Sequence, residues 1–175
     1  RIVEAEASPQ VLAQADLLAA IYGQRQNESA YHGVRSAGAP RSRIDRVFFG
    51  PLVVLAAARW AIDDEPFEER VATDVGHSGY ARGQALLVQA QGVRALRRGE
   101  HARAEQLLLD ALQAFTTLRS GYDRAVALVD HADALERLGR AGEAAKGLEE
   151  ARTIADLGGA VALRAAIDAR SARVG

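Results

Sequence analysis

Serine, histidine and carboxylate side chains are the groups of this chain that could do chemistry, but their spacing does not match known catalytic or metal-binding motifs. In Gly76-His77-Ser78-Gly79, a hydrolase nucleophile turn would need glycine two residues after the serine, where Tyr80 stands. No strand-like segment precedes this turn. No two histidines lie three or four residues apart, and no HExxH pattern occurs, so we expect neither catalytic nor metal-binding residues. The histidines are His32, His77, His101 and His131.

The sequence also lacks the motifs of common cofactors. Lys146 is the only lysine, and Gly147 follows it, so no Walker A phosphate loop can be built. Cysteine is absent, which excludes disulfides, thiolate chemistry and cysteine-bound metal clusters. We therefore expect no cofactor.

An enzyme is the alternative from a different functional class. His131 is close in sequence to Asp130 and Asp133, an arrangement open to metal binding or proton transfer, but a packed or hydrogen-bonded imidazole is the simpler interpretation. Catalysis would require a pocket joining distant residues such as His77, Asp74 and His131.

Arginines are concentrated in and beside a predicted glycine–proline loop at residues 33–42. Arginine suits recognition of phosphate or carboxylate, so this segment could contact an anion or an acidic partner; alternatively, it is a solvated loop in a chain that prefers arginine to lysine. The formal net charge of −1 disfavours nonspecific binding to nucleic acid. The arginines concerned are Arg35, Arg41, Arg43 and Arg46.

The composition predicts an all-α protein. Alanine is abundant, aromatic residues are only 5% of the chain, and β-branched runs are short, which favours closely packed helices over a sheet. The longest apolar stretch, near residues 53–58, falls short of the ~20 residues that span a bilayer. Without a signal-like segment either, we expect a cytoplasmic protein and no membrane contact. The missing methionine and the initial Arg1 suggest a piece of a larger protein.

We expect one helical domain over residues 1–175, with divergent helices in 1–79. Ser8-Pro9 favours a helix start, and Gly50-Pro51 predicts either a kinked helix or two short ones within 43–62. The acidic turn at 63–66 opens another helix. Residues 80–119 and 120–159 then form two similar repeats, with helices at 80–98, 101–119, 121–138 and 141–157. Ser120 and Asp123 resemble a capping box, and 160–175 supplies a capping helix, predicted at 160–173.

The two repeats share their turn glycine and several helix-interface residues at a spacing of forty. This order of residues resembles the tetratricopeptide repeat (TPR), whose usual length is about 34 residues. Longer repeats of this kind resemble those of bacterial LuxR-type ATP-binding transcriptional regulators and related signalling proteins. The resemblance rests on Gly92 and Ala132, Gly99 and Gly139, Ala104 and Ala144, Leu108 and Leu148, and Ala111 and Ala151.

The resemblance implies antiparallel helical hairpins stacked into a right-handed superhelix, or α-solenoid. It implies a noncatalytic module that binds a protein or peptide, or docks other domains of a larger regulator, with a small-effector-sensing domain as the alternative. The first helices would line the concave face. Residues on that face would contact either a partner or another part of this chain; they are Leu86, Gln89, Val93, Leu96, Arg97, Val126, Val129, Asp133, Glu136 and Arg137.

Overall fold

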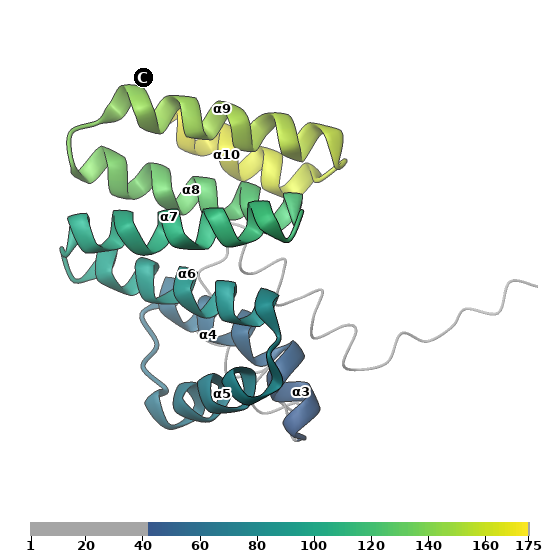
Figure 1. The fold of residues 1–175 in the computed structure, drawn as a ribbon. Helices are drawn as coiled ribbons and strands as arrows, with labels where there is room; N and C mark the ends of the chain where they lie inside the picture. The colour runs from purple at the N-terminus through teal and green to yellow at the C-terminus, as the bar shows by residue number, and fades with distance from the viewer. Residues whose placement is uncertain (1–41, 175) are drawn as a thin grey trace, which may run out of the picture.

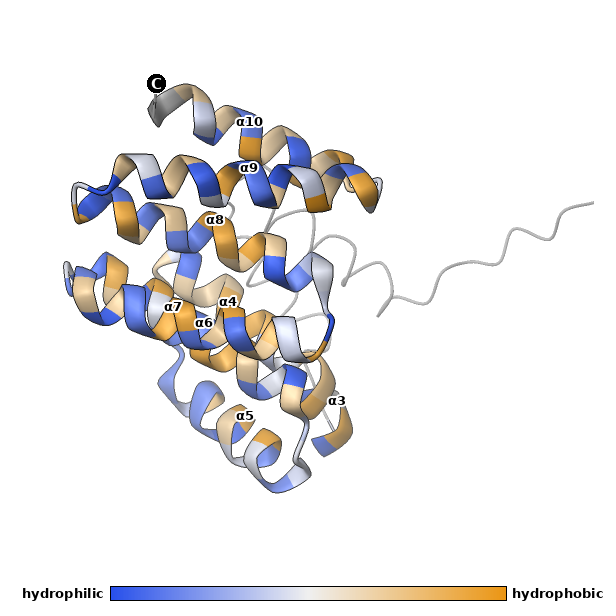
Figure 2. Ribbon diagram, turned by 45° about the horizontal axis from the view of Figure 1, so that its top comes forward, coloured by the Kyte–Doolittle hydropathy of each residue, from blue (hydrophilic) through white to orange (hydrophobic). Residues whose placement is uncertain are grey.

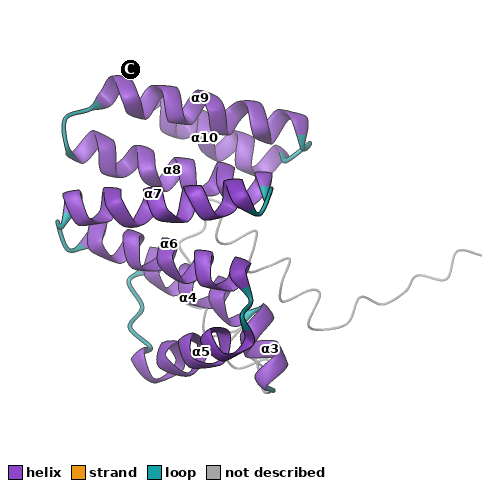
Figure 3. Cartoon of the chain, viewed as in Figure 1, coloured by secondary structure: helices purple, strands orange, loops and turns teal. Residues whose placement is uncertain are grey.

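The computed structural model describes residues 42–174, which form helices joined by short turns and contain no strand (Figures 1 and 3). The predicted all-α class is confirmed for this part of the chain. The predicted helix start at Ser8-Pro9 lies outside the described residues. The helices are α3 (Arg43–Phe48), α4 (Gly50–Trp60), α5 (Glu65–Ser78), α6 (Ala81–Arg97), α7 (His101–Thr117), α8 (Gly121–Arg137), α9 (Ala141–Leu157) and α10 (Val161–Val174).

This part of the chain forms two short helices, α3 and α4, rather than one kinked helix; the break is at Phe49, and Gly50-Pro51 begins α4. Pro51 lies in the first turn of α4, where its missing N–H is not needed. Gly50 approaches α5 closely, because a Cβ there would lie 2.7 Å from Cγ2 of Val71. Every residue from Gly50 to Ala58 is buried. A helix that is apolar and buried on all sides belongs to the interior, and α4 packs against α6.

From α6 onward the helices follow a twenty-residue rhythm. They begin at residues 81, 101, 121, 141 and 161, so the limits predicted from the sequence are correct to within two residues. Each helix packs against the next in the chain, and their axes lie side by side in one stack (Figure 1). Polar and apolar residues alternate along these ribbons, as amphipathic helices require (Figure 2).

The turns within this stack share one geometry. The backbone N–H of Glu100 donates to the carbonyl of Ala95 at 2.9 Å, and that of Gly99 to Leu96 at 3.2 Å, which is the Schellman pattern. The residue two positions before the start of each helix from α6 to α10 has a positive φ. These residues are Gly79, Gly99, Arg119, Gly139 and Gly159. Arg119, with φ 54°, is the one residue of this set that is not glycine. A residue with a side chain is strained in this conformation.

Small residues allow close contact within each hairpin. Ala104 and Ala144 are fully buried, as the repeat pattern predicts. Gly92 is tighter still, because a Cβ there would lie 2.8 Å from Cγ of the buried Leu108. These contacts fix the separation of the paired helices.

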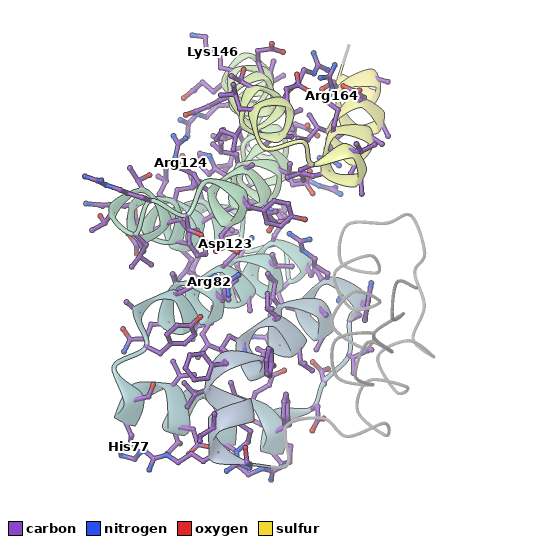
Figure 4. The ribbon with its side chains drawn as sticks, turned by 90° about the vertical axis from the view of Figure 1, so that its right-hand side faces the viewer. His77, Arg82, Asp123, Arg124, Lys146 and Arg164 are labelled. Atoms are coloured by element: carbon purple, nitrogen blue, oxygen red, sulfur yellow. The ribbon has the colours of Figure 1, made fainter. Side chains whose placement is uncertain are left out.

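The capping box predicted at Ser120 and Asp123 does not form, although α8 begins there. Neither residue makes a side-chain cap; the Ser120 hydroxyl instead donates to the Asp123 carboxylate. Asp123 is buried and accepts two hydrogen bonds from Arg82 of α6, at 2.6 and 2.9 Å (Figure 4). This hydrogen bonding raises the pKa of the Arg82 guanidinium. A tertiary ion pair has replaced the local cap.

No helix among residues 42–174 is long and apolar enough to cross a membrane.

Candidate functional site

Part of the predicted concave face lies in the interior. Leu86, Gln89 and Val93 of α6, and Val126 of α8, are buried. The apolar members belong to the same core cluster as the residues of α4. For these four residues, burial favours the second of the two expected contacts, with another part of this chain, and contact with a partner stays a prediction.

Polar side chains join α4 to this face. Arg59 near the end of α4 donates two hydrogen bonds to the Asp130 carboxylate of α8, at 2.6 and 2.8 Å. The fully buried Gln89 donates from Nε2 to the same carboxylate at 2.7 Å. Three helices therefore meet at Asp130, and the charge-assisted bonds compensate its burial.

Charged members of the predicted face also have partners within the chain. Arg97 is exposed, but its guanidinium donates a hydrogen bond of 2.9 Å to the carbonyl of Ala58. Its positive charge is favourable there, because the C-terminal end of α4 carries partial negative charge. Arg170 of α10 contacts both Asp133 and Glu136. Burial raises the pKa of the Asp133 carboxyl to about 6; Arg170 opposes this rise, while Asp130 and Glu136 add to it.

The three other predicted contact residues are also accessible or partly so. Leu96 and Val129 are half-buried against the core clusters, and Arg137 is exposed. Their contact with a partner stays a prediction.

The arginine segment is only partly described. Arg35 and Arg41 lie outside the described residues. Arg46 donates from Nε to Asp74 of α5 at 2.6 Å, and Nε of Arg43 lies 3.5 Å from the same carboxylate. For these two arginines the structure provides an internal acidic partner, so the charge offered to an external anion is reduced.

The residues considered for catalysis do not form a cluster. No group of three histidine, aspartate or glutamate residues within 42–174 could hold a metal ion. Asp74 is paired with Arg46, and His77 is exposed on α5. His131 is on α8, where burial lowers the pKa of its imidazole.

A groove between α6 and α7 is a candidate binding site for a ligand. Its volume is about 440 Å³. The apolar lining is Ala81, Ala85, Val88, Ala111, Ala114 and Leu118, and the polar lining is Gln84, Asp110, Gln113 and Thr117. The polar residues are all exposed, whereas Ala85 and Ala111 are buried and form the bottom of the groove.

The corresponding place between α8 and α9 carries larger apolar side chains at two of the lining positions. At a spacing of forty, Val88 corresponds to Leu128 and Ala114 to Ile154. Leu128 is buried. Ile154 packs over Gly121: a Cβ added at Gly121 would lie 3.6 Å from Cγ2 of Ile154. Three other lining positions carry smaller residues in the second hairpin, so the repeat alignment by itself does not locate the groove.

Comparison with protein-family models, with curated protein sequences and with solved structures found no match to this chain.

Proposed function

We propose that this protein is a noncatalytic protein- or peptide-binding module and that the groove between α6 and α7 is its binding site. The observation that carries the proposal is the groove itself, an apolar surface with a polar edge, at a place where the other hairpin has larger apolar side chains at two positions. Grooves of this character suit the side chains of a partner.

The architecture that we propose is a TPR-like, right-handed stack of helical hairpins. Its support is the constant twenty-residue rhythm, the shared turn geometry and the packing of each helix on its successor. Such stacks present binding surfaces formed by several repeats. By the resemblance of the repeats, we place this module in a larger cytoplasmic bacterial regulator.

The experiment is selection of peptides from a random display library against the full chain, followed by affinity measurements with a variant whose groove is filled. The variant carries Val88→Leu and Ala114→Ile, the nearest apolar equivalents of the second hairpin. Because these side chains occupy the groove, we expect the selected peptides to bind at least tenfold more weakly. The matched control is Ala145→Ile, which places the same side chain at an exposed position of α9.

Equal affinity for the parent and the filled variant would move the binding site elsewhere. Arg97→Glu with Arg137→Glu then tests the accessible part of the first-helix face. Circular dichroism on each variant shows whether the fold is retained. Failure to select any peptide that binds to the groove would overturn the proposal.

A small effector is the second candidate occupant, because the groove volume lies within the range of small-molecule pockets. Thermal-shift screening of a metabolite library separates the two: an effector would raise the melting temperature of the parent but not of the filled variant.

Turnover of any substrate by the purified chain would instead support an enzyme. Retention on a polyanion column that falls steeply with salt would support nucleic-acid binding.

A further inference from the structure

We infer that the groove between α6 and α7 recognises an arginine side chain of its partner. This inference rests on the proposed function and specifies the chemistry of the ligand. Its basis is that the second hairpin contains an arginine of its own at the corresponding place.

The second hairpin shows how an arginine is held there. Nε of Arg124 donates to the Thr116 hydroxyl of α7 at 3.0 Å, and its guanidinium contacts the Glu150 carboxylate of α9. Arg124 therefore links α8 to both neighbouring helices, and its charge is matched by an acidic residue. Arg124 is labelled on α8 in Figure 4.

The first hairpin keeps the acidic group but lacks the arginine. Gln84 stands where Arg124 does, and Asp110 where Glu150 does. Both line the groove. No arginine or lysine pairs with Asp110 within residues 42–174; its carboxylate accepts a hydrogen bond of 3.3 Å from the neighbouring Gln106. The groove lining thus carries one negative charge and no positive one.

The remaining lining specifies the rest of the ligand. Ala85, Ala111 and Val88 offer an apolar surface on which the methylene groups of an arginine can lie. The planar guanidinium donates in several directions and is weakly hydrated, so it suits a carboxylate beside an apolar groove better than a lysine ammonium does. The amide oxygen of Gln84 is a further acceptor on the same edge.

The test titrates the full chain with four blocked amino acids as probes. Binding is measured from the NMR chemical shifts of the backbone amides. The probes are acetyl-arginine methylamide, its neutral isostere acetyl-citrulline methylamide, acetyl-lysine methylamide and acetyl-norleucine methylamide. We expect arginine to shift the amides of the groove residues and to bind about threefold to tenfold more tightly than citrulline, as for a partly exposed charged pair.

Two variants test the assigned groups. Asp110→Asn should weaken arginine binding about threefold to tenfold and leave norleucine binding unchanged. Gln84→Arg rebuilds the arginine of the second hairpin, so it should pair with Asp110, abolish arginine binding and maintain or raise the melting temperature. Gln84→Glu is the matched control, because it changes the same side chain without supplying a donor.

The outcomes separate this inference from the proposed function. Equal binding of arginine and citrulline, tighter binding of norleucine, or no arginine-induced shifts in the groove would overturn the inference. Peptides that are displaced by filling the groove but show no preference for arginine would leave the proposed function standing. If no peptide binds to the groove, both fail.

Discussion

Hairpins α6–α7 and α8–α9 share a backbone plan but differ at the positions that line the groove or face a neighbouring helix. Their helices have equal lengths and the same turn geometry, and Ala104 and Ala144 are fully buried at equivalent places. The surroundings differ, because α4 packs on α6 whereas α10 packs on α9. The groove lies in the first hairpin, between its own two helices.

The comparison separates residues that build the repeat from residues that specialise it. Small residues at helix contacts set the separation of the helices and tolerate little change. Positions at the edge of the groove are freer, since a change from Ile to Ala or from Arg to Gln there alters a cavity and its charge without altering the backbone plan. One backbone plan can thus carry different side chains at the edge of this groove.

The largest expected effect comes from charging the shared helix contacts. Ala104→Glu or Ala144→Glu should destabilise the protein by several kcal/mol, on the order of 3 or more, because an unpaired carboxylate would enter a fully buried contact. Chemical denaturation followed by circular dichroism measures the change. Near-parental stability of both variants would refute the interface assignment. A tolerated charge in one hairpin alone would show that the two contacts are not equivalent.

A smaller loss should follow from making the first hairpin like the second at Gly92. Alanine stands at the corresponding position 132, but in the first hairpin a Cβ would lie 2.8 Å from Cγ of Leu108. We expect Gly92→Ala to destabilise by about 1–2 kcal/mol, although alanine favours helix formation. The exposed Gly142→Ala, with nothing within 4 Å of the added Cβ, is the control and should stabilise. Stabilisation by Gly92→Ala would show that the first hairpin is less tightly packed.

A gain is expected at the turn that joins the two hairpins. Arg119 has a positive φ, where the matching turns within the hairpins have glycine. Arg119→Gly should therefore raise the free energy of unfolding by about 0.5–1 kcal/mol, since it removes the strain of a side chain in the left-handed region. Thermal and urea unfolding provide the measurement. Gly139→Ala is the reciprocal control and should destabilise; a loss of stability in Arg119→Gly would indicate that the arginine side chain contributes contacts that exceed the strain.

The smallest effect concerns pH and Asp133, which replaces the buried Val93 of the first hairpin. Its pKa rises from 3.8 to about 6 on folding, so the folded state holds the proton more tightly. This carboxyl therefore lowers stability as pH increases from about 4 to 6, and Asp133→Asn should remove that dependence.

We expect a change of under about 1 kcal/mol, because the Asp133 side chain is one-third exposed and solvent screens its charge. Urea unfolding at several pH values compares the parent with Asp133→Asn. Parallel pH profiles for the two proteins would contradict the assigned shift.

Local signals were sufficient to predict much of the helical framework. Turn glycines and the period of apolar residues placed α6 to α10, and Ala104 and Ala144 were correctly assigned to helix contacts. The same signals led to a capping box at Ser120 that does not form, because the Asp123 carboxylate is engaged by Arg82 from another helix. A helix cap competes with tertiary ion pairs for the same carboxylate. A short stretch of sequence contains the residues of the cap but not the distant arginine.

The candidate site was harder to predict. The repeat pattern indicated which residues of α6 and α8 face away from their own hairpins, but it could not show whether that face was open. Arg59 and Asp130 are 71 residues apart, and their pairing depends on where α4 packs. The groove between α6 and α7 depends on how the side chains of both helices pack, and the repeat alignment by itself does not locate it.

The sequence by itself determined the helical class, the twenty-residue rhythm and the small residues of the hairpin contacts, because helix periodicity and turn geometry are local properties of the chain. Only the tertiary structure decided that α4 would pack on α6, that Asp130 would join three helices, and which hairpin would carry the groove. These features depend on the volumes and charges of residues distant in sequence, and the whole packed molecule selects among them.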